Sequence, residues 1–160
     1  MTDISVFPTI DNVLYYGKNV VTMECSLNNT IHAGQVVICS KDGPSRNVTP
    51  ALHVNSSVGN SGANVGVAID DASSGEEARI ALAQTMVMVA NCDDTTAIDA
   101  GTWVEASSNT VGGTVIACVG GAYDSSESHY PIGITFEDIA GGGTGLLIVQ
   151  PCCYKKYRRP

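Results

Sequence analysis

The sequence has few aromatic and few charged residues. Of its 160 residues, 6% are aromatic and 15% are charged, while small residues, valine and isoleucine dominate. This composition argues against a helical bundle or a coiled coil and favours a β-rich chain with tight turns. At this length the chain is most simply one domain with a core of its own.

Basic residues are scarce outside the last few positions. Four of the eight, Lys155, Lys156, Arg158 and Arg159, lie in the last six positions, so residues 1–154 carry four basic and sixteen acidic residues, a formal charge of −12. A body of this charge repels nucleic-acid phosphate. We therefore expect no nucleic-acid partner for the main domain.

Signals for secretion, membranes and metal binding are missing as well. The first residues, MTDISVFPTIDN, are acidic, and no apolar run approaches the length of a membrane span. We therefore expect synthesis in a cytoplasm, no membrane partner and mostly free thiols among the six cysteines. No CxxC pair occurs and the three histidines stand apart, so we expect no metal site.

No motif for catalysis or for a cofactor stands out. The chain has no GxSxG elbow and no HExxH, and no cysteine lies in a recognisable catalytic context. The glycine run at 141–145, GGGTG, lacks the Lys-Ser/Thr of a phosphate loop. We expect a protein that is not an enzyme and that carries no cofactor.

What the chain does have is an internal repeat with an offset of 67 residues. Segment 33–40 (AGQVVICS) aligns with 100–107 (AGTWVEAS), and segment 64–83 (NVGVAIDDASSGEEARIALA) aligns with 131–150 (PIGITFEDIAGGGTGLLIVQ) without a gap. Identical pairs include Ala33/Ala100, Gly34/Gly101, Val37/Val104, Gly66/Gly133, Asp71/Asp138 and Gly75/Gly142. Either the chain contains a duplicated structural unit, or the match is a coincidence in a chain rich in Gly, Ala, Val and Ser.

Short apolar segments separated by turn residues predict strands. We expect them at 13–23, 34–40, 64–69, 102–106, 113–119, 131–137 and 146–150. Segment 76–90 has helix-favouring residues, but its repeat counterpart is glycine-rich, so we predict strand there too. Segment 41–63 is expected to be a long surface loop, and 93–99 one short helical turn capped by Asp93 or Asp94.

These elements predict an all-β fold with little helix. We expect a compact β-barrel or β-tulip-like domain over 13–150, built from two similar strand-turn-strand halves (about 33–83 and 100–150) that close on each other. An extended N-terminal arm, 1–12, precedes the domain, and a basic tail, 151–160, follows it.

Two features inside the repeat have a structural and a functional interpretation. Asp70–Asp71 recurs as Glu137–Asp138 before a glycine-bearing turn, which favours turn-stabilising hydrogen bonds, with a calcium site as the alternative. Trp103, aligned with Val36, is interpreted as core filling. Tyr15–Tyr16 place one ring on each face of a strand, so one ring is expected to be exposed.

The tail is the strongest candidate for partner binding in the sequence. Tyr154, Lys155, Lys156, Tyr157, Arg158 and Arg159 combine four cations with two aromatic rings. They predict either a solvated tail or an anchor on an acidic neighbouring surface.

The order AGQVV…VGVAIDDASSGEEARIAL…AIDAGTWV…PIGITFEDIAGGGTGLLIV resembles the small β-rich decoration (cement) proteins of tailed-bacteriophage capsids, over about 33–150. The resemblance implies a homotrimer on the outside of an icosahedral head, at local threefold positions, clamping and stabilising the major capsid protein lattice. It implies a location on the outer capsid surface of the virion. The arm, with Asp3 and Phe7, would order on docking and extend the contact.

Two other classes of function remain open. A carbohydrate- or receptor-binding module of the head or tail surface would need an exposed cluster of aromatic side chains. An enzyme would need several polar residues converging in one cleft.

Overall fold

The computed structural model describes residues 5–10, 15–39, 47–50, 64–91, 93–107, 111–118 and 131–151; for Cys39 and 47–50 it describes the backbone only. Within these ranges the regular structure consists of strands. They are β1 (Tyr15–Tyr16), β2 (Val20–Cys25), β3 (Val36–Cys39), β4 (Asn47–Pro50), β5 (Asn64–Ala68), β6 (Glu77–Ala81), β7 (Met86–Ala90), β8 (Trp103–Ala106), β9 (Val115–Ala117), β10 (Pro131–Thr135) and β11 (Thr144–Val149). The prediction of an all-β fold made of two similar halves is confirmed.

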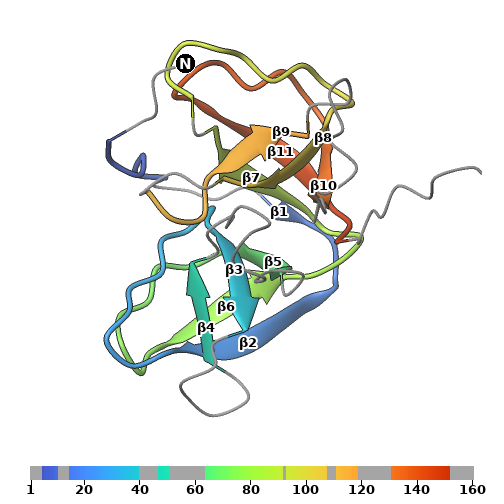
Figure 1. Cartoon of the computed structure of the whole chain (residues 1–160). Helices are drawn as coiled ribbons and strands as arrows, with labels where there is room; N and C mark the ends of the chain where they lie inside the picture. Colours follow the sequence, from blue (N-terminus) through green and yellow to red (C-terminus); the bar gives the residue numbers. More distant parts are fainter. Residues whose placement is uncertain are drawn as a thin grey trace, which may run out of the picture.

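The strands form two units, one below the other in Figure 1. The first unit is a closed barrel with the order β2-β4-β3-β5-β6. The second contributes β7 to β11 to a sheet with the order β1-β7-β11-β10-β8-β9. A parallel bridge between Asn91 and Val115 joins the end of β7 to β9, as the parallel β2–β4 pairing joins Cys25 to Val48 in the first unit.

The strand registers repeat with the same 67-residue offset as the sequence. Val37 pairs with Gly66 in the first unit, and Val104 pairs with Gly133 in the second. Position 104 is 67 after 37, and 133 is 67 after 66. Both pairings carry a register shift at the equivalent place. The two units therefore share their pairing pattern down to an irregularity.

The expectation that the two half-sheets close on each other is wrong. The strands of the first unit pair with one another and form their own barrel, because β2 completes it beside β6 and β4. The counterpart of β2 is β7, at an offset of 66: Val20 pairs with Ala81, and Met86 pairs with Ile148. A gapless alignment starting at residue 33 cannot include this strand.

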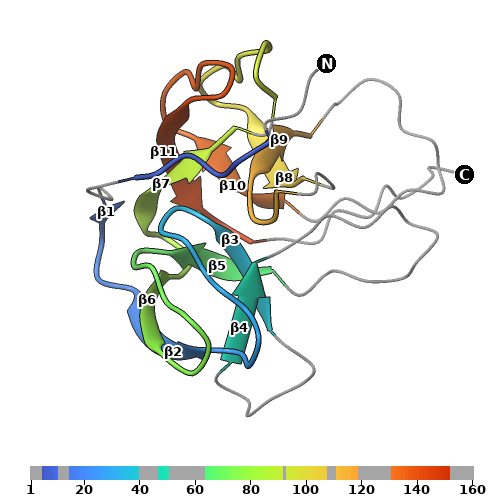
Figure 2. The same cartoon turned by 90° about the vertical axis from the view of Figure 1, so that its left-hand side faces the viewer.

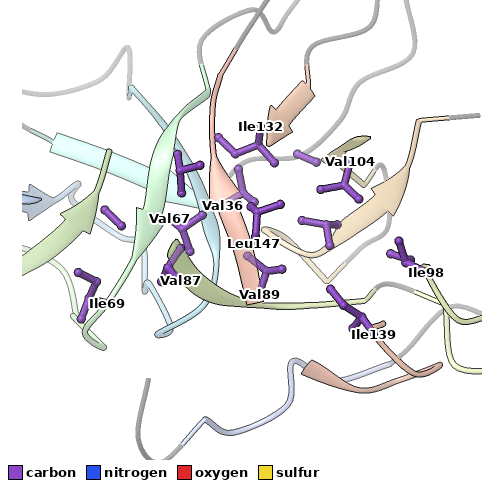
Figure 3. Close-up of a cluster of buried hydrophobic side chains, with 14 residues drawn as sticks. Val36, Val67, Ile69, Val87, Val89, Ile98, Val104, Ile132, Ile139 and Leu147 are labelled. Atoms are coloured by element: carbon purple, nitrogen blue, oxygen red, sulfur yellow. The ribbon is translucent and has the colours of Figure 1, made fainter. Parts of the chain in front are cut away.

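Two clusters of buried apolar side chains hold the units together. One fills the first barrel: Cys25, Ile31, Val37, Ala68, Ala72, Ala78 and Ile80. The other contains the interior of the second unit together with Val36, Val67, Ile69 and Ala81 from the first unit (Figure 3). The two units are thus packed against each other through a shared cluster. In the part of the chain that the structure describes, Cys25 is a buried free thiol.

Four local predictions need correction. Segment 13–23 contains two strands, because the backbone at Gly17, with φ of 138°, interrupts the extended conformation between β1 and β2. Segment 76–90 is strand as predicted, but a turn at Gln84, with φ of 68°, divides it into β6 and β7. The turn over 93–99 is not helical. Strand β4 lies inside the predicted loop 41–63, and that loop's remaining residues lie outside the described ranges.

Candidate partner-binding surfaces

Of the eight residues predicted to bind a partner, Phe7 alone falls in the described part of the chain. Its ring stacks on His32, with 6.0 Å between the ring centroids and 15° between the planes. Asp3 and the tail residues, Tyr154, Lys155, Lys156, Tyr157, Arg158 and Arg159, lie outside the described residues. Their role in binding stays a prediction.

Residues 5–10 of the arm lie against the body (Figure 2). A Cβ atom on Gly34, which has φ of 87°, would lie 2.5 Å from the Ile10 Cδ1 atom and 3.3 Å from the Met88 carbonyl oxygen. Gly34 therefore leaves the space that Ile10 occupies. Val6 remains 74% exposed, so this end of the arm offers an apolar side chain to the outside.

The paired acids stabilise turns, as predicted, in the same way in both units. The N–H of Ala33 donates to Asp71 Oδ1, and the N–H of Ala100 donates to Asp138 Oδ1, each at 2.8 Å. These bonds connect the turn after β5 or β10 to the Ala-Gly turn before β3 or β8. This shared role explains why Asp71/Asp138 and Ala33/Ala100 are identical between the repeats. No group of three potential metal ligands occurs among the described residues.

Arg79 connects the two units. It donates to both carboxylate oxygens of Asp70, at 2.7 and 2.8 Å, and its guanidinium lies 5.5 Å from the centre of the Tyr15 ring on β1. The hydrogen bonds from Arg79 hold the pKa of Asp70 below its usual value. This cation is therefore engaged within the molecule.

A row of large apolar side chains crosses the outer face of the six-stranded sheet. Trp103 pairs with Ile134, Ile134 with Ile148, Ile148 with Met86, and Met86 with Tyr16. Residues paired in this way point to the same side of a sheet, so the five form one continuous strip, which we call the outer row. Tyr16 is 58% exposed, Trp103 is 37% exposed, and the other three are half-buried.

Phe136, which follows β10, extends the same face. It is two residues beyond Ile134, is 56% exposed, and its N–H donates to the carbonyl of Leu146. The interpretation of Trp103 as core filling is wrong, because the second unit's interior lies on the opposite side of β8. The prediction that one ring of Tyr15–Tyr16 is exposed is confirmed: Tyr15 packs on the core.

Asp93 organises the loop between β7 and β8. Its Oδ1 atom accepts the N–H groups of Thr95 and Thr96, at 2.9 and 3.2 Å, and the Thr95 hydroxyl. The Asp93 carbonyl accepts the N–H of Gly142 at 2.7 Å, which ties this loop to the glycine-rich turn. These hydrogen bonds favour the ionised carboxylate and lower its pKa to about 2.

Asp93 is expected to make stability depend on pH in the acid range. A pKa lowered from about 3.9 in the unfolded chain to about 2 in the fold stabilises the fold above the unfolded value. That stabilisation is lost as the pH falls towards 2. We expect Asp93→Asn to be less stable than wild type at pH 6 and to lose less stability on acidification, as measured by urea unfolding.

The matched control is Asp94→Asn, since Asp94 is the exposed neighbour. It should leave the stability at pH 6 close to wild type. Equal acid slopes for Asp93→Asn and wild type would contradict the assigned role of Asp93.

Together these features define a class of structure: two tandem five-stranded β-units that share a core and expose one apolar sheet face. No protein-family model matches the sequence, and no curated protein matches it either. No helix that could span a membrane occurs among the described residues.

Among solved structures, a phage protein shares this fold over nearly the whole length of the phage protein's chain. The match is to the crystal structure of the head fibre gp8.5 N base of bacteriophage phi29, with a TM-score of 0.50 and 13% sequence identity. The match covers 86% of this chain and 99% of the phi29 chain. At this identity the likeness establishes a common fold.

Proposed function

We propose that this chain is a structural protein of a phage head, which binds the outside of the capsid shell. The observation that carries the proposal is the fold match to the base of a phage head fibre, which includes almost the whole of that base. The sequence resemblance to capsid decoration proteins also points to the head of a virion.

In its finer form, the proposal is a decoration protein that stabilises the lattice of the major capsid protein as a homotrimer. The protein would act by binding and not by catalysis. A trimer presents three copies of a modest contact, so that avidity holds it on the shell even where one contact is weak. The arm, packed on the body through Phe7 and Ile10, offers the exposed Val6 as part of such a contact.

The test is to purify particles from a culture that carries the gene and to quantify the protein on intact heads by mass spectrometry. Many copies per head, located on the outer surface by electron microscopy, are expected. Heads that lack the protein should then rupture at lower temperature or on chelation. Its absence from purified heads would overturn the proposal, and equally robust heads without it would remove the stabilising role.

Removal of the tail, residues 154–160, is expected to weaken head association and to leave the domain folded. The tail carries four of the eight basic residues of the chain, and a formally negative body makes it the natural contact for an acidic surface. Occupancy on heads should be several-fold lower for the truncated chain than for the full chain, and added salt should lower the occupancy of the full chain as it screens the tail's contact.

A full-length variant with Lys155, Lys156, Arg158 and Arg159 replaced by glutamine separates charge from length. It should behave like the truncated chain if charge makes the contact. Unchanged occupancy of both variants on heads would rule the tail out as an anchor.

The second candidate is a carbohydrate- or receptor-binding module. The three exposed aromatic rings of Tyr16, Trp103 and Phe136 favour it. Between the first two, however, the outer row consists of Met86, Ile148 and Ile134, which cannot hydrogen-bond to sugar hydroxyls. This aliphatic character suits a protein surface better than a glycan.

A further inference from the structure

The outer face of the second unit is partly exposed, whereas the equivalent face of the first unit is buried. In the first unit the face is formed by Val36, Val67, Ile69 and Ala81, whose exposed fractions are 0, 0, 5 and 0%. These side chains belong to the cluster shared with the second unit. The first unit's face is therefore buried by the unit that follows it in the chain.

The same four positions in the second unit are open. Sixty-seven residues on, they are Trp103, Ile134, Phe136 and Ile148, which are exposed or half-buried. Three of the four substitutions replace a small or medium side chain by a clearly larger apolar one: Val36 by Trp103, Ile69 by Phe136 and Ala81 by Ile148. Among the described residues, the more apolar version of the face is thus the one that remains partly exposed.

A contiguous apolar strip with aromatic side chains at both ends is typical of a binding surface. The outer row and Phe136 include no charged residue, in a chain with a formal charge of −8. The strip itself therefore brings no carboxylate into a contact between two acidic molecules. The row also begins on β1, whose Tyr15 packs on the cluster shared by the units, so it continues the surface that already joins them.

We propose that the outer row and Phe136 dock on a second copy of this chain. The chain itself provides the precedent, because it covers the equivalent face of the first unit with a unit of the same fold. The inference rests on the self-association in the proposed function and is independent of the head. An asymmetric contact of this kind closes into a ring when the rotation between copies permits it.

The experiment uses the full chain in the absence of phage heads. Trp103 is the single tryptophan of the protein and lies in the proposed contact, so its emission reports on this surface directly. Sedimentation velocity should show an oligomer that dissociates on dilution. Over the same concentrations the Trp103 emission should shift to the red as water reaches the ring.

Phe136→Ser is the test variant, since Phe136 is 56% exposed and its loss leaves the interior intact. It should raise the dissociation constant about tenfold or more, as expected when an aromatic anchor is truncated. Leu27→Ser is the matched control, because Leu27 is 62% exposed and lies in the first unit, outside the row. It should associate like wild type, and urea unfolding should show both variants folded.

Several outcomes would overturn the proposal. One is a monomer with solvent-exposed Trp103 emission at every concentration. Another is an oligomer that Phe136→Ser leaves unchanged, which would place self-association on another surface. A Trp103 blue shift that requires added heads, or an added glycan, would assign the face to the capsid or to a sugar. Because none of the self-association measurements needs heads, their failure is distinguishable from failure of the head-protein proposal.

Discussion

Replacing Gly133 with alanine is expected to destabilise the protein by about 3 kcal/mol or more, at the upper end of the cost of overpacking a core. A Cβ atom on Gly133 would lie 2.0 Å from the Ile148 carbonyl oxygen and 3.0 Å from its carbonyl carbon. Both are backbone atoms of β11, so no side chain can rotate to relieve the clash. Strand β11 must move, and it pairs with both β10 and β7.

The duplicate position makes the same prediction for the first unit. A Cβ atom on Gly66 would lie 2.1 Å from the Ala81 carbonyl oxygen, so Gly66→Ala should cost a similar amount. The control is Gly101→Ala. Gly101 has φ of 79°, but no atom lies within 4 Å of the Cβ atom that alanine would add. The Gly101→Ala variant therefore has backbone strain without a steric clash, which costs about 1 kcal/mol.

Urea unfolding followed by circular dichroism measures all three variants. The expected order of stability is wild type, then Gly101→Ala, then the two strand variants. If Gly133→Ala proved no less stable than Gly101→Ala, the close approach of β10 and β11 would be refuted.

Leu147→Ala is expected to destabilise the protein by about 2 to 5 kcal/mol, the usual range for a buried leucine. Leu147 is fully buried, and it pairs with Thr135 on one side and Val87 on the other. It belongs to the cluster that also contains Val36 and Val67 of the first unit. The cavity therefore weakens the packing of both units.

Ile148→Ala, one residue further along the same strand, is the matched control. Ile148 lies in the outer row and is half-buried, so its truncation in dilute solution should cost only about 1 kcal/mol. The denaturant midpoint should fall much more for Leu147→Ala than for Ile148→Ala, with an unchanged slope. Equal losses would mean that β11 does not divide interior from exterior as described.

Much of the local structure follows from the sequence, because strands and turns depend on near neighbours. Short apolar segments beside turn residues correctly predict β10 and β11, and the acids Asp71 and Asp138 correctly predict stabilised turns. The prediction for 93–99 was wrong for a local reason: the carboxylate of Asp93 caps an irregular loop, held by Gly142, and no helix follows.

The candidate site was harder to predict. The sequence predicted partner binding by the charged tail. The outer row, by contrast, takes one residue from each of five strands between positions 16 and 148. No single segment shows such a row, since it forms only through strand pairing. The one available signal was the substitution of Trp103 for Val36 between the repeats.

The amino-acid order alone specifies that the chain is β-rich and where most strands and turns lie, and it indicates an internal repeat, which the strand registers then show to be one structural unit present twice. The tertiary structure determines two further points. The first unit closes into a barrel of its own, and equivalent positions on the outer face are buried in the first unit and partly exposed in the second. Val36 is buried and Trp103 is 37% exposed because the second unit packs on the first, whereas no described strand covers the equivalent face of the second unit. Local sequence sets which side chains share a face, but only the neighbouring unit determines whether that face meets water.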